Sequence, residues 1–191
     1  MFLYECLILQ SSKCGILLGQ QRYLILIKRE REIYKMKTLI AYFSWSGNTE
    51  KIARNIAAKT GGDLFRIERQ IPYSKNYNEC AYHEAKDEID GKIRPEIKRP
   101  LPNICNYDSI ILAFPIWCYT SPMAVWSFLE AYPDWKGKTI YIFPNSYTDD
   151  SQYFTTSMED AKNSARNADI QPGLFNKEIK KLDAWLTEKG F

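Results

Sequence analysis

Three uninterrupted apolar runs, each about the length of one β-strand, constrain the fold of this chain most. They are KTLIAYF (37–43), YDSIILAF (107–114) and KTIYIF (138–143). A strand that is apolar on both faces must be covered by other elements on both sides. Because segments with helical spacing of apolar residues separate these runs, the sequence predicts a parallel β-sheet with helices on both faces.

The remaining elements follow from the same periodicity and from turn residues. Two further strands are predicted at 63–69 and 169–171, and helices at 49–60, 76–89, 123–132 and 157–168. A last helix is expected to begin at Asn176 as N-cap and to bury Ile179, Leu182, Trp185 and Leu186. About five β-α repeats between residues 36 and 191 fit a three-layer, doubly wound, five-stranded sheet better than a barrel of about 250 residues.

Residues 1–35 are predicted to be an N-terminal extension of a domain that covers residues 36–191. From Met36 the chain reads MKTLIAYFSWSGNTEK, as many cytoplasmic α/β domains begin, so we expect an upstream start codon or a dispensable segment. The alternative is that residues 22–28 add a strand or an amphipathic contact. No run approaches the roughly 20 apolar residues that span a bilayer, and no secretory signal pattern is present.

Charge and metal-ligating residues argue against several classes of function. The net charge is +3, but residues 1–36 hold six basic and three acidic residues, which leaves 20 of each in the remainder. A neutral body gives no support for nucleic-acid binding. Five cysteines without a CxxC pair and a single histidine, His83, cannot assemble a zinc site, and their scatter predicts reduced thiols in a cytoplasmic protein.

A hydroxyl-rich loop, SWSGNT (44–49), connects the first apolar run to the first helix. In a doubly wound sheet ligands bind beyond the carboxyl ends of the strands, and a helix N-terminus there attracts an anion. Gly47 permits a tight turn, and the hydroxyls and the Asn48 amide are donors, so the loop can hold a phosphate. A plain capped turn, with Ser46 or Asn48 serving only as N-cap, explains the loop equally well.

Other phosphate-binding and hydrolytic motifs do not appear. No GxGxxG follows a strand, and no GxSxG is present. Gly137-Lys138-Thr139 looks like the end of a P-loop but lacks its first glycine, because position 132 is Tyr132, and it precedes a strand. The loop at 44–49 therefore remains the strongest candidate for a ligand site.

Two segments resemble the flavodoxin-like family. SWSGNTEK after the first strand is similar to the flavodoxin phosphate loop, and FPIWCYTSPMAVWSFLE (114–130) is similar to the flavin-flanking loop and helix after the third strand. The resemblance extends through 71–88, resumes in the last helix and covers essentially residues 36–191. It implies a five-stranded parallel sheet of order 2-1-3-4-5.

The resemblance also implies FMN as the cofactor and assigns its ligands. The phosphate would be held by the loop residues Ser44, Ser46, Gly47, Asn48 and Thr49, with Trp45 lining the approach. Trp117 would lie beside the isoalloxazine, where an indole face excludes water. The other residues implied at the flavin are Pro115, Ile116, Cys118, Tyr119, Ser146 and Tyr147.

The sequence departs from the family pattern in two loops. Relatives usually carry glycine where this chain has Tyr119, which would restrict a turn that needs positive φ. The third loop, predicted as residues 144–160, has no glycine, and Asp149 and Asp150 would either repel a reduced flavin or point to solvent. Cys118 is expected to be a buried small residue, the alternative being a redox-active thiol. Tyr73, Tyr77 and Tyr82 are expected to pack, the alternative being that they roof the site.

The function predicted from these features is noncovalent FMN binding with one- or two-electron transfer in a cytoplasmic flavoprotein, a monomer or homodimer. No side chain needs to act as acid or base, because the cofactor performs the chemistry. The redox partner would be a protein or a small-molecule electron acceptor. The alternatives are an NAD(P)H-dependent flavin or quinone reductase, an oxidoreductase with an open flavin face, and a flavin-free binding module on the same fold.

Overall fold

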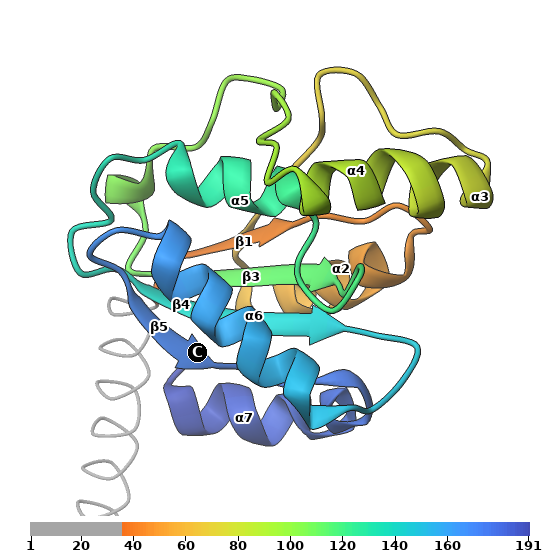
Figure 1. Ribbon diagram of the computed structural model, residues 1–191. Coiled ribbons are helices and arrows are strands. Elements are labelled where there is room, and N and C mark those ends of the chain that lie inside the picture. Colours follow the sequence, from red (N-terminus) through yellow and green to blue (C-terminus); the bar gives the residue numbers. More distant parts are fainter. Residues whose placement is uncertain (1–35) are drawn as a thin grey trace, which may run out of the picture. The chain divides into compact units, whose positions relative to one another are not determined.

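A computed structural model describes residues 36–191. The predictions for residues 1–35, including a contact from 22–28, lie outside the described residues. The sheet has five strands: β1 (Thr38–Tyr42), β2 (Asp63–Arg66), β3 (Ser109–Pro115), β4 (Thr139–Asn145) and β5 (Asp169–Pro172). All neighbouring pairs are parallel and the order is β2-β1-β3-β4-β5, which confirms the predicted fold (Figure 1).

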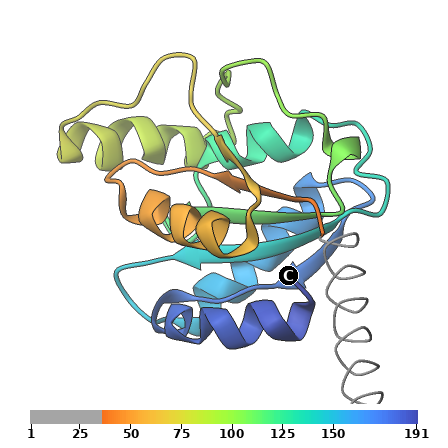
Figure 2. The ribbon, with the colours of Figure 1, turned by 180° about the vertical axis from the view of Figure 1, so that it is seen from behind.

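Helices cover both faces of this sheet. Helices α2 (Asn48–Thr60) and α7 (Leu182–Lys189) lie on one face, and α5 (Met123–Glu130) and α6 (Ser151–Ser164) lie on the other (Figures 1 and 2). The alternation of side chains along β1 explains how one strand serves both layers: Leu39 and Ala41 join the α5–α6 core, whereas Ile40 and Tyr42 join the α2–α7 core. The apolar runs that predicted the fold are therefore buried on both sides.

A further helical stretch precedes β3 and contains an irregular turn. It begins as α3 (Tyr77–Glu79), passes through a π-helical turn, η1 (Cys80–Glu84), and ends as α4 (Ala85–Asp90). The Asn76 side chain caps its start by accepting hydrogen bonds from the amides of Asn78 and Glu79. Two short 3₁₀ helices, η2 (Ile104–Asn106) and η3 (Asn176–Lys181), complete the described elements.

Two predicted helix starts were wrong. Helix α6 begins at Ser151 rather than at 157, because Asp150 caps it by accepting a 2.9 Å hydrogen bond from the Gln152 amide. The loop after β4 is consequently short and ends before this helix. Asn176 is not an N-cap, since Phe175 occupies that position before η3, and Asn176 itself has a φ of 44°.

Three loops follow the carboxyl ends of β1, β3 and β4 and gather at one edge of the sheet, on the right in Figure 1. They comprise residues 43–47, 116–122 and 146–150. This edge is where a doubly wound sheet binds ligands. None of the helices between residues 36 and 191 combines the length and the apolar character needed to span a bilayer.

Candidate functional site

The loop after β1 leaves the N-terminus of α2 open. Gly47 is the N-cap, with a φ of 87°, and no side chain caps the helix there. The Gly47 amide donates a 3.1 Å hydrogen bond to the Ser44 hydroxyl, which closes the turn from the strand side. The alternative in which Ser46 or Asn48 serves as N-cap was therefore wrong. The free amides of the first turn and the positive end of the helix dipole favour an anion at this point.

A cavity of about 450 Å³, here called the central cavity, lies at this helix end. It is bounded by all three loops of the carboxyl edge. Its lining residues are Trp45, Ser46, Asn48, Thr49, Ile52, Pro115, Ile116, Trp117, Asn145, Ser146 and Tyr147. No lysine or arginine is among them, so an anion bound here would depend on main-chain amides and hydroxyls.

The structure brings most of the sequence-predicted site residues to this cavity. Ser44 and Gly47 are not among the lining residues but shape the loop, while Cys118 and Tyr119 line a neighbouring hollow of about 550 Å³. Sequence reasoning missed Ile52 and Asn145. Both carried a usable signal, because Ile52 lies one helical turn after Thr49, and Asn145 ends β4 opposite Pro115 in the parallel register.

Trp117 is a fixed wall of the central cavity. Its ring lies edge-on against Phe43, with 5.2 Å between centroids, and against Tyr73 at 5.1 Å. The Tyr73 hydroxyl donates a 2.5 Å hydrogen bond to Glu88, which holds Tyr73 in place. Trp45 is also fixed, because its Nε1 donates to the Ser74 carbonyl oxygen at 2.9 Å. The two tryptophans are thus preorganised by packing and hydrogen bonds.

The Glu88 carboxyl that anchors this wall is almost fully buried. The guanidinium of Arg69 lies 3.4 Å from it and 4.2 Å from the centroid of the Tyr73 ring. Burial raises the pKa of Glu88 above its usual range, although the hydrogen bond from Tyr73 and the charge of Arg69 partly oppose this. Burial likewise raises the pKa of Tyr73, so this hydroxyl stays a donor at neutral pH.

The loop after β3 contains a two-residue turn in the left-handed region. Trp117 and Thr120 exchange hydrogen bonds of 2.8 and 3.0 Å, and between them Cys118 and Tyr119 have φ values of 45° and 70°. Positive φ at both central residues is the geometry that normally selects glycine or asparagine. The sequence predicted that Tyr119 would restrict a turn that needs positive φ. The structure has such a turn here, and Tyr119 adopts it in spite of its bulk.

The side chains of this turn face outward. Tyr119 is 71% exposed and packs against Tyr153, with 5.6 Å between ring centroids. Cys118 is exposed, so the expectation of a buried residue was wrong; the outward direction follows from the turn geometry. Partial desolvation still raises the pKa of the Cys118 thiol, which therefore remains protonated at neutral pH.

Asn176, the first residue of η3, binds the loop after β4 through its side chain. Its Oδ1 accepts a 2.6 Å hydrogen bond from the Ser146 amide, and its Nδ2 donates to the Thr148 carbonyl oxygen at 2.5 Å and to Asp149 at 3.1 Å. Asp149 also forms an ion pair with Lys177, and these partners lower the pKa of its carboxyl. Asp149 and Asp150 therefore anchor the loop and cap α6.

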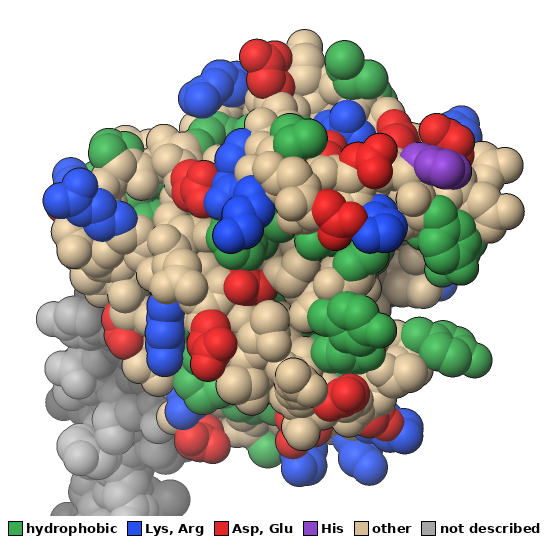
Figure 3. All heavy atoms as spheres, viewed as in Figure 1, with side chains coloured by type: hydrophobic (Ala, Val, Ile, Leu, Met, Phe, Trp, Pro, Cys, Tyr) green, Lys and Arg blue, Asp and Glu red, His purple; other side chains and the backbone are tan. Residues whose placement is uncertain are grey.

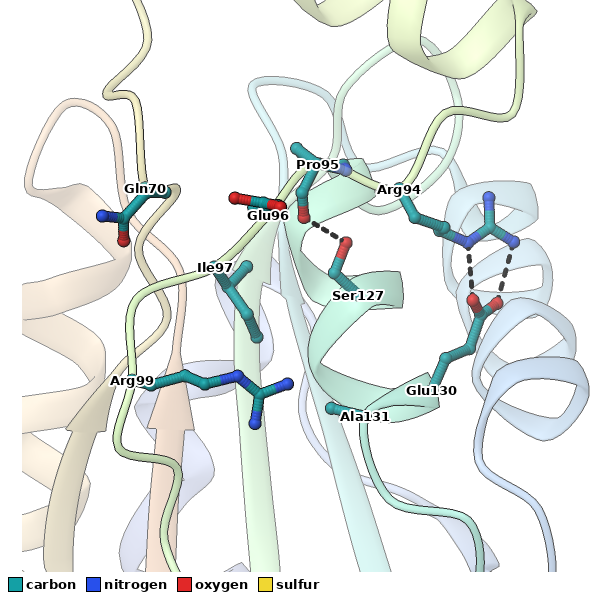
Figure 4. Close-up of a pocket in the computed structure, with 9 residues that line it drawn as sticks. All are labelled: Gln70, Arg94, Pro95, Glu96, Ile97, Arg99, Ser127, Glu130 and Ala131. Carbon is teal, nitrogen blue, oxygen red and sulfur yellow. Dashed lines mark hydrogen bonds and ion pairs between the residues drawn. The ribbon is translucent and has the colours of Figure 1, made fainter.

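A larger hollow lies elsewhere, between residues 94–99 and α5. It measures about 640 Å³, and three of its polar side chains, those of Arg94, Glu130 and Ser127, make hydrogen bonds within it (Figure 4). Arg94 forms two hydrogen bonds of 2.8 Å with Glu130, and the Ser127 hydroxyl donates to the Pro95 carbonyl oxygen at 2.8 Å. It contains none of the predicted site residues, so it is not the candidate site.

Comparison with known proteins places the chain in a family. The sequence profile of the family described as Flavodoxin matches residues 37–189. A flavoprotein candidate from Bacteroides eggerthii DSM 20697 is 30% identical, with a TM-score of 0.68 over 80% of this chain and 97% of its own.

A flavoprotein from Lactobacillus acidophilus NCFM, solved in complex with FMN, is 24% identical, with a TM-score of 0.66 over 78% of this chain and 98% of its own. The apo-form of the flavoprotein from the same organism, solved by NMR, is 25% identical, with a TM-score of 0.59 over 78% of this chain and 97% of its own. No curated protein matched. The profile match covers most of the chain, including the loops of the central cavity, and the chain belongs to the flavodoxin family.

Proposed function

We propose that this protein binds FMN noncovalently in the central cavity and transfers electrons through it. The observation that carries the proposal is the open N-terminus of α2, which faces the same cavity as Trp45 and Trp117. One end of the cavity thus suits a phosphate, and the other suits a flat aromatic ring system. Family membership supports the same cofactor.

The residues present fit this group in their chemistry. Main-chain amides of the first turn of α2, with the side chains of Ser46, Asn48 and Thr49, would hold the phosphate. Pro115, Ile116, Trp117, Ser146 and Tyr147, from the other two loops, would hold the ring system. When bound, FMN supplies one- and two-electron chemistry.

The protein contributes orientation and exclusion of water rather than proton transfer. Trp117 is held by Phe43 and Tyr73, so its ring can shield one side of the cavity without reorganising on binding. The nearest titratable side chain of the turn, Cys118, has a raised pKa and stays neutral. Residues 37–191 carry equal numbers of basic and acidic residues, and this balance favours a partner that is not recognised by a strong charge.

A flavin titration with matched threonine variants tests the proposal. Thr49 and Thr60 are both buried threonines of α2, at opposite ends of the helix, and only Thr49 lines the central cavity. We expect FMN to bind the purified apo-protein with quenched emission, and Thr49→Val to weaken binding about 10- to 100-fold through loss of a hydrogen bond to a charged group.

Riboflavin, which lacks the phosphate, should bind both proteins equally, and Thr60→Val should leave FMN affinity unchanged. No binding of FMN at tens of micromolar by a folded protein would overturn the proposal. Equal weakening of FMN and riboflavin by Thr49→Val would refute the phosphate assignment.

A further inference from the structure

A second pocket adjoins the central cavity, and Trp117 lines both of them. The second pocket has a volume of about 400 Å³ and is here called the aromatic pocket. Its lining residues are Trp45, Tyr77, Cys80, Ala81, Tyr82, Ala85, Lys86, Ile116, Trp117 and Cys118. Trp45, Ile116 and Trp117 belong to both cavities. A ligand in the aromatic pocket would therefore contact the wall of the proposed flavin site.

Two tyrosine side chains beside this pocket are more exposed to solvent than tyrosines usually are. Tyr77 and Tyr82 are each 61% exposed, although tyrosine rings normally bury most of their surface, so the expectation that they pack was wrong. The rings of Trp45 and Tyr77 meet at 6.2 Å, and those of Tyr77 and Tyr82 at 6.0 Å, both edge-on. Hydrophobic side chains stand out near the single histidine at this edge (Figure 3). Contiguous exposed apolar patches are typical of binding sites.

The π-helical turn η1 is an independent indication at the same place. Cys80, Ala81 and Tyr82, which lie in this turn, line the pocket. A π-turn inside an α-helix is rare and occurs frequently at functional sites. Two small residues, Ala81 within the turn and Ala85 directly after it, line the pocket together with Tyr82. Their small side chains leave space between the tyrosines and Trp117.

The lining defines the chemistry of the occupant. The pocket is mostly apolar, and burial raises the pKa of the Cys80 thiol to about 11, so that side chain is neutral. The one charged lining group is the Lys86 ammonium, which pairs with Asp90 at the surface and retains donors for an oxygen atom. A volume of about 400 Å³ lies at the small-molecule end of the range for ligand sites.

We propose that the aromatic pocket binds a flat, uncharged aromatic molecule that carries ring carbonyls, of the naphthoquinone class. Its rings would lie among Trp45, Tyr77 and Tyr82, and a carbonyl would face Lys86. The binding rests on the pocket itself. Only the assignment of this ligand as a small-molecule redox partner rests on the proposed function.

Binding of dimethylnaphthoquinone to the full-length protein tests the proposal, because its substituted quinone carbons do not add thiols. Tryptophan quenching and calorimetry give the dissociation constant, first without FMN and then with FMN present. Tyr77→Ala/Tyr82→Ala should raise the constant about tenfold, since two aromatic contacts are lost, and Tyr77→Phe/Tyr82→Phe should leave it within about twofold. Both tyrosines are exposed, so these variants are expected to fold.

Two controls sharpen the assignment. Ile93→Ala removes an exposed apolar side chain that lies outside the pocket, and it should change nothing. Lys86→Met should weaken the quinone but not dimethylnaphthalene, which lacks the carbonyls. Equal effects of Lys86→Met on the two ligands would overturn the assigned carbonyl contact.

The outcomes separate this inference from the proposed function. Quinone binding that depends on the two tyrosines supports the pocket, whether or not FMN binds; if FMN alone fails, the proposed function falls and the pocket stands. One-for-one displacement of the quinone by FMN would overturn the inference, since the pocket would then belong to the flavin site. No quinone binding, or binding insensitive to the loss of both tyrosine rings, would also overturn it.

Discussion

Replacement of Asn176 is the sharpest test of how the third loop is held. Its side chain makes three hydrogen bonds, to Ser146, Thr148 and Asp149, from a residue whose φ is 44°. A hydrogen bond contributes about 0.5–1.5 kcal/mol net, and these are at or near the surface, so Asn176→Gly should lower the free energy of unfolding by about 1–2 kcal/mol. Asn176→Ala should cost about 1 kcal/mol more, because alanine is strained at positive φ whereas glycine is not.

Urea unfolding gives the order of stability, and hydrogen exchange tests the mechanism at one atom. The Ser146 amide, which donates to Asn176 at 2.6 Å, should exchange about tenfold faster in Asn176→Gly. Asn167 provides a matched control, because it also has positive φ, at 61°, but its Nδ2 donates to Asp134 instead. Asn167→Gly should leave Ser146 exchange unchanged.

Two results would refute this account of Asn176. The first is unchanged protection of the Ser146 amide in Asn176→Gly. The second is equal stability of the glycine and alanine variants at position 176. Since Ser146 and Tyr147 line the central cavity, Asn176→Gly should also weaken FMN binding, whereas Asn167→Gly should not.

Four further changes follow from the geometry. Tyr119→Gly should raise the urea midpoint by an amount corresponding to at most about 1 kcal/mol, because φ is 70° there and the lost ring is mostly exposed; a lower midpoint would contradict the strain. Gly173→Ala should destabilise by about 1–3 kcal/mol, since its Cβ would overlap the Phe143 ring and the Ile142 carbonyl oxygen; wild-type stability would show that both move away freely. Alkylation of Cys118, followed by peptide mass mapping, should be slower at pH 7 than that of a free cysteine and should accelerate beyond the ordinary thiol pKa. Because the folded-state pKa of Glu88 is raised, protonation favours the fold, so wild type should gain stability relative to Glu88→Gln as the pH falls from 7 toward 4.5, and a constant difference would exclude this.

The fold could be predicted from the sequence because its strands are apolar on both faces. Leu39 and Ile40 enter different cores from one strand, and the run KTLIAYF carries that information without tertiary knowledge. The turn from β1 into α2 was also readable, because Gly47 and its hydroxyl neighbours are adjacent in the chain. Local patterns were sufficient for these two features but not for the start of α6, although its cap, Asp150, lies next to the helix.

Features that depend on distant partners could not be read in this way. Asn176 has the composition of an N-cap, but its hydrogen-bond partners lie 27 to 30 residues earlier. The positive φ of Cys118 and Tyr119 follows from the hydrogen bonds between Trp117 and Thr120, and the residue types alone argue against it. The exposure of Tyr77 and Tyr82 likewise depends on how the helix with the π-turn lies against Trp45.

The position of Trp117 between two cavities has a thermodynamic consequence. If a ligand on one side changes the affinity of the other side through this shared wall, linkage requires the same factor in both directions. With both sites in use, the concentration of one ligand would set the apparent dissociation constant of the other. The occupancy of each cavity would then depend on the cellular concentrations of both ligands, and neither dissociation constant would be a fixed property of the protein.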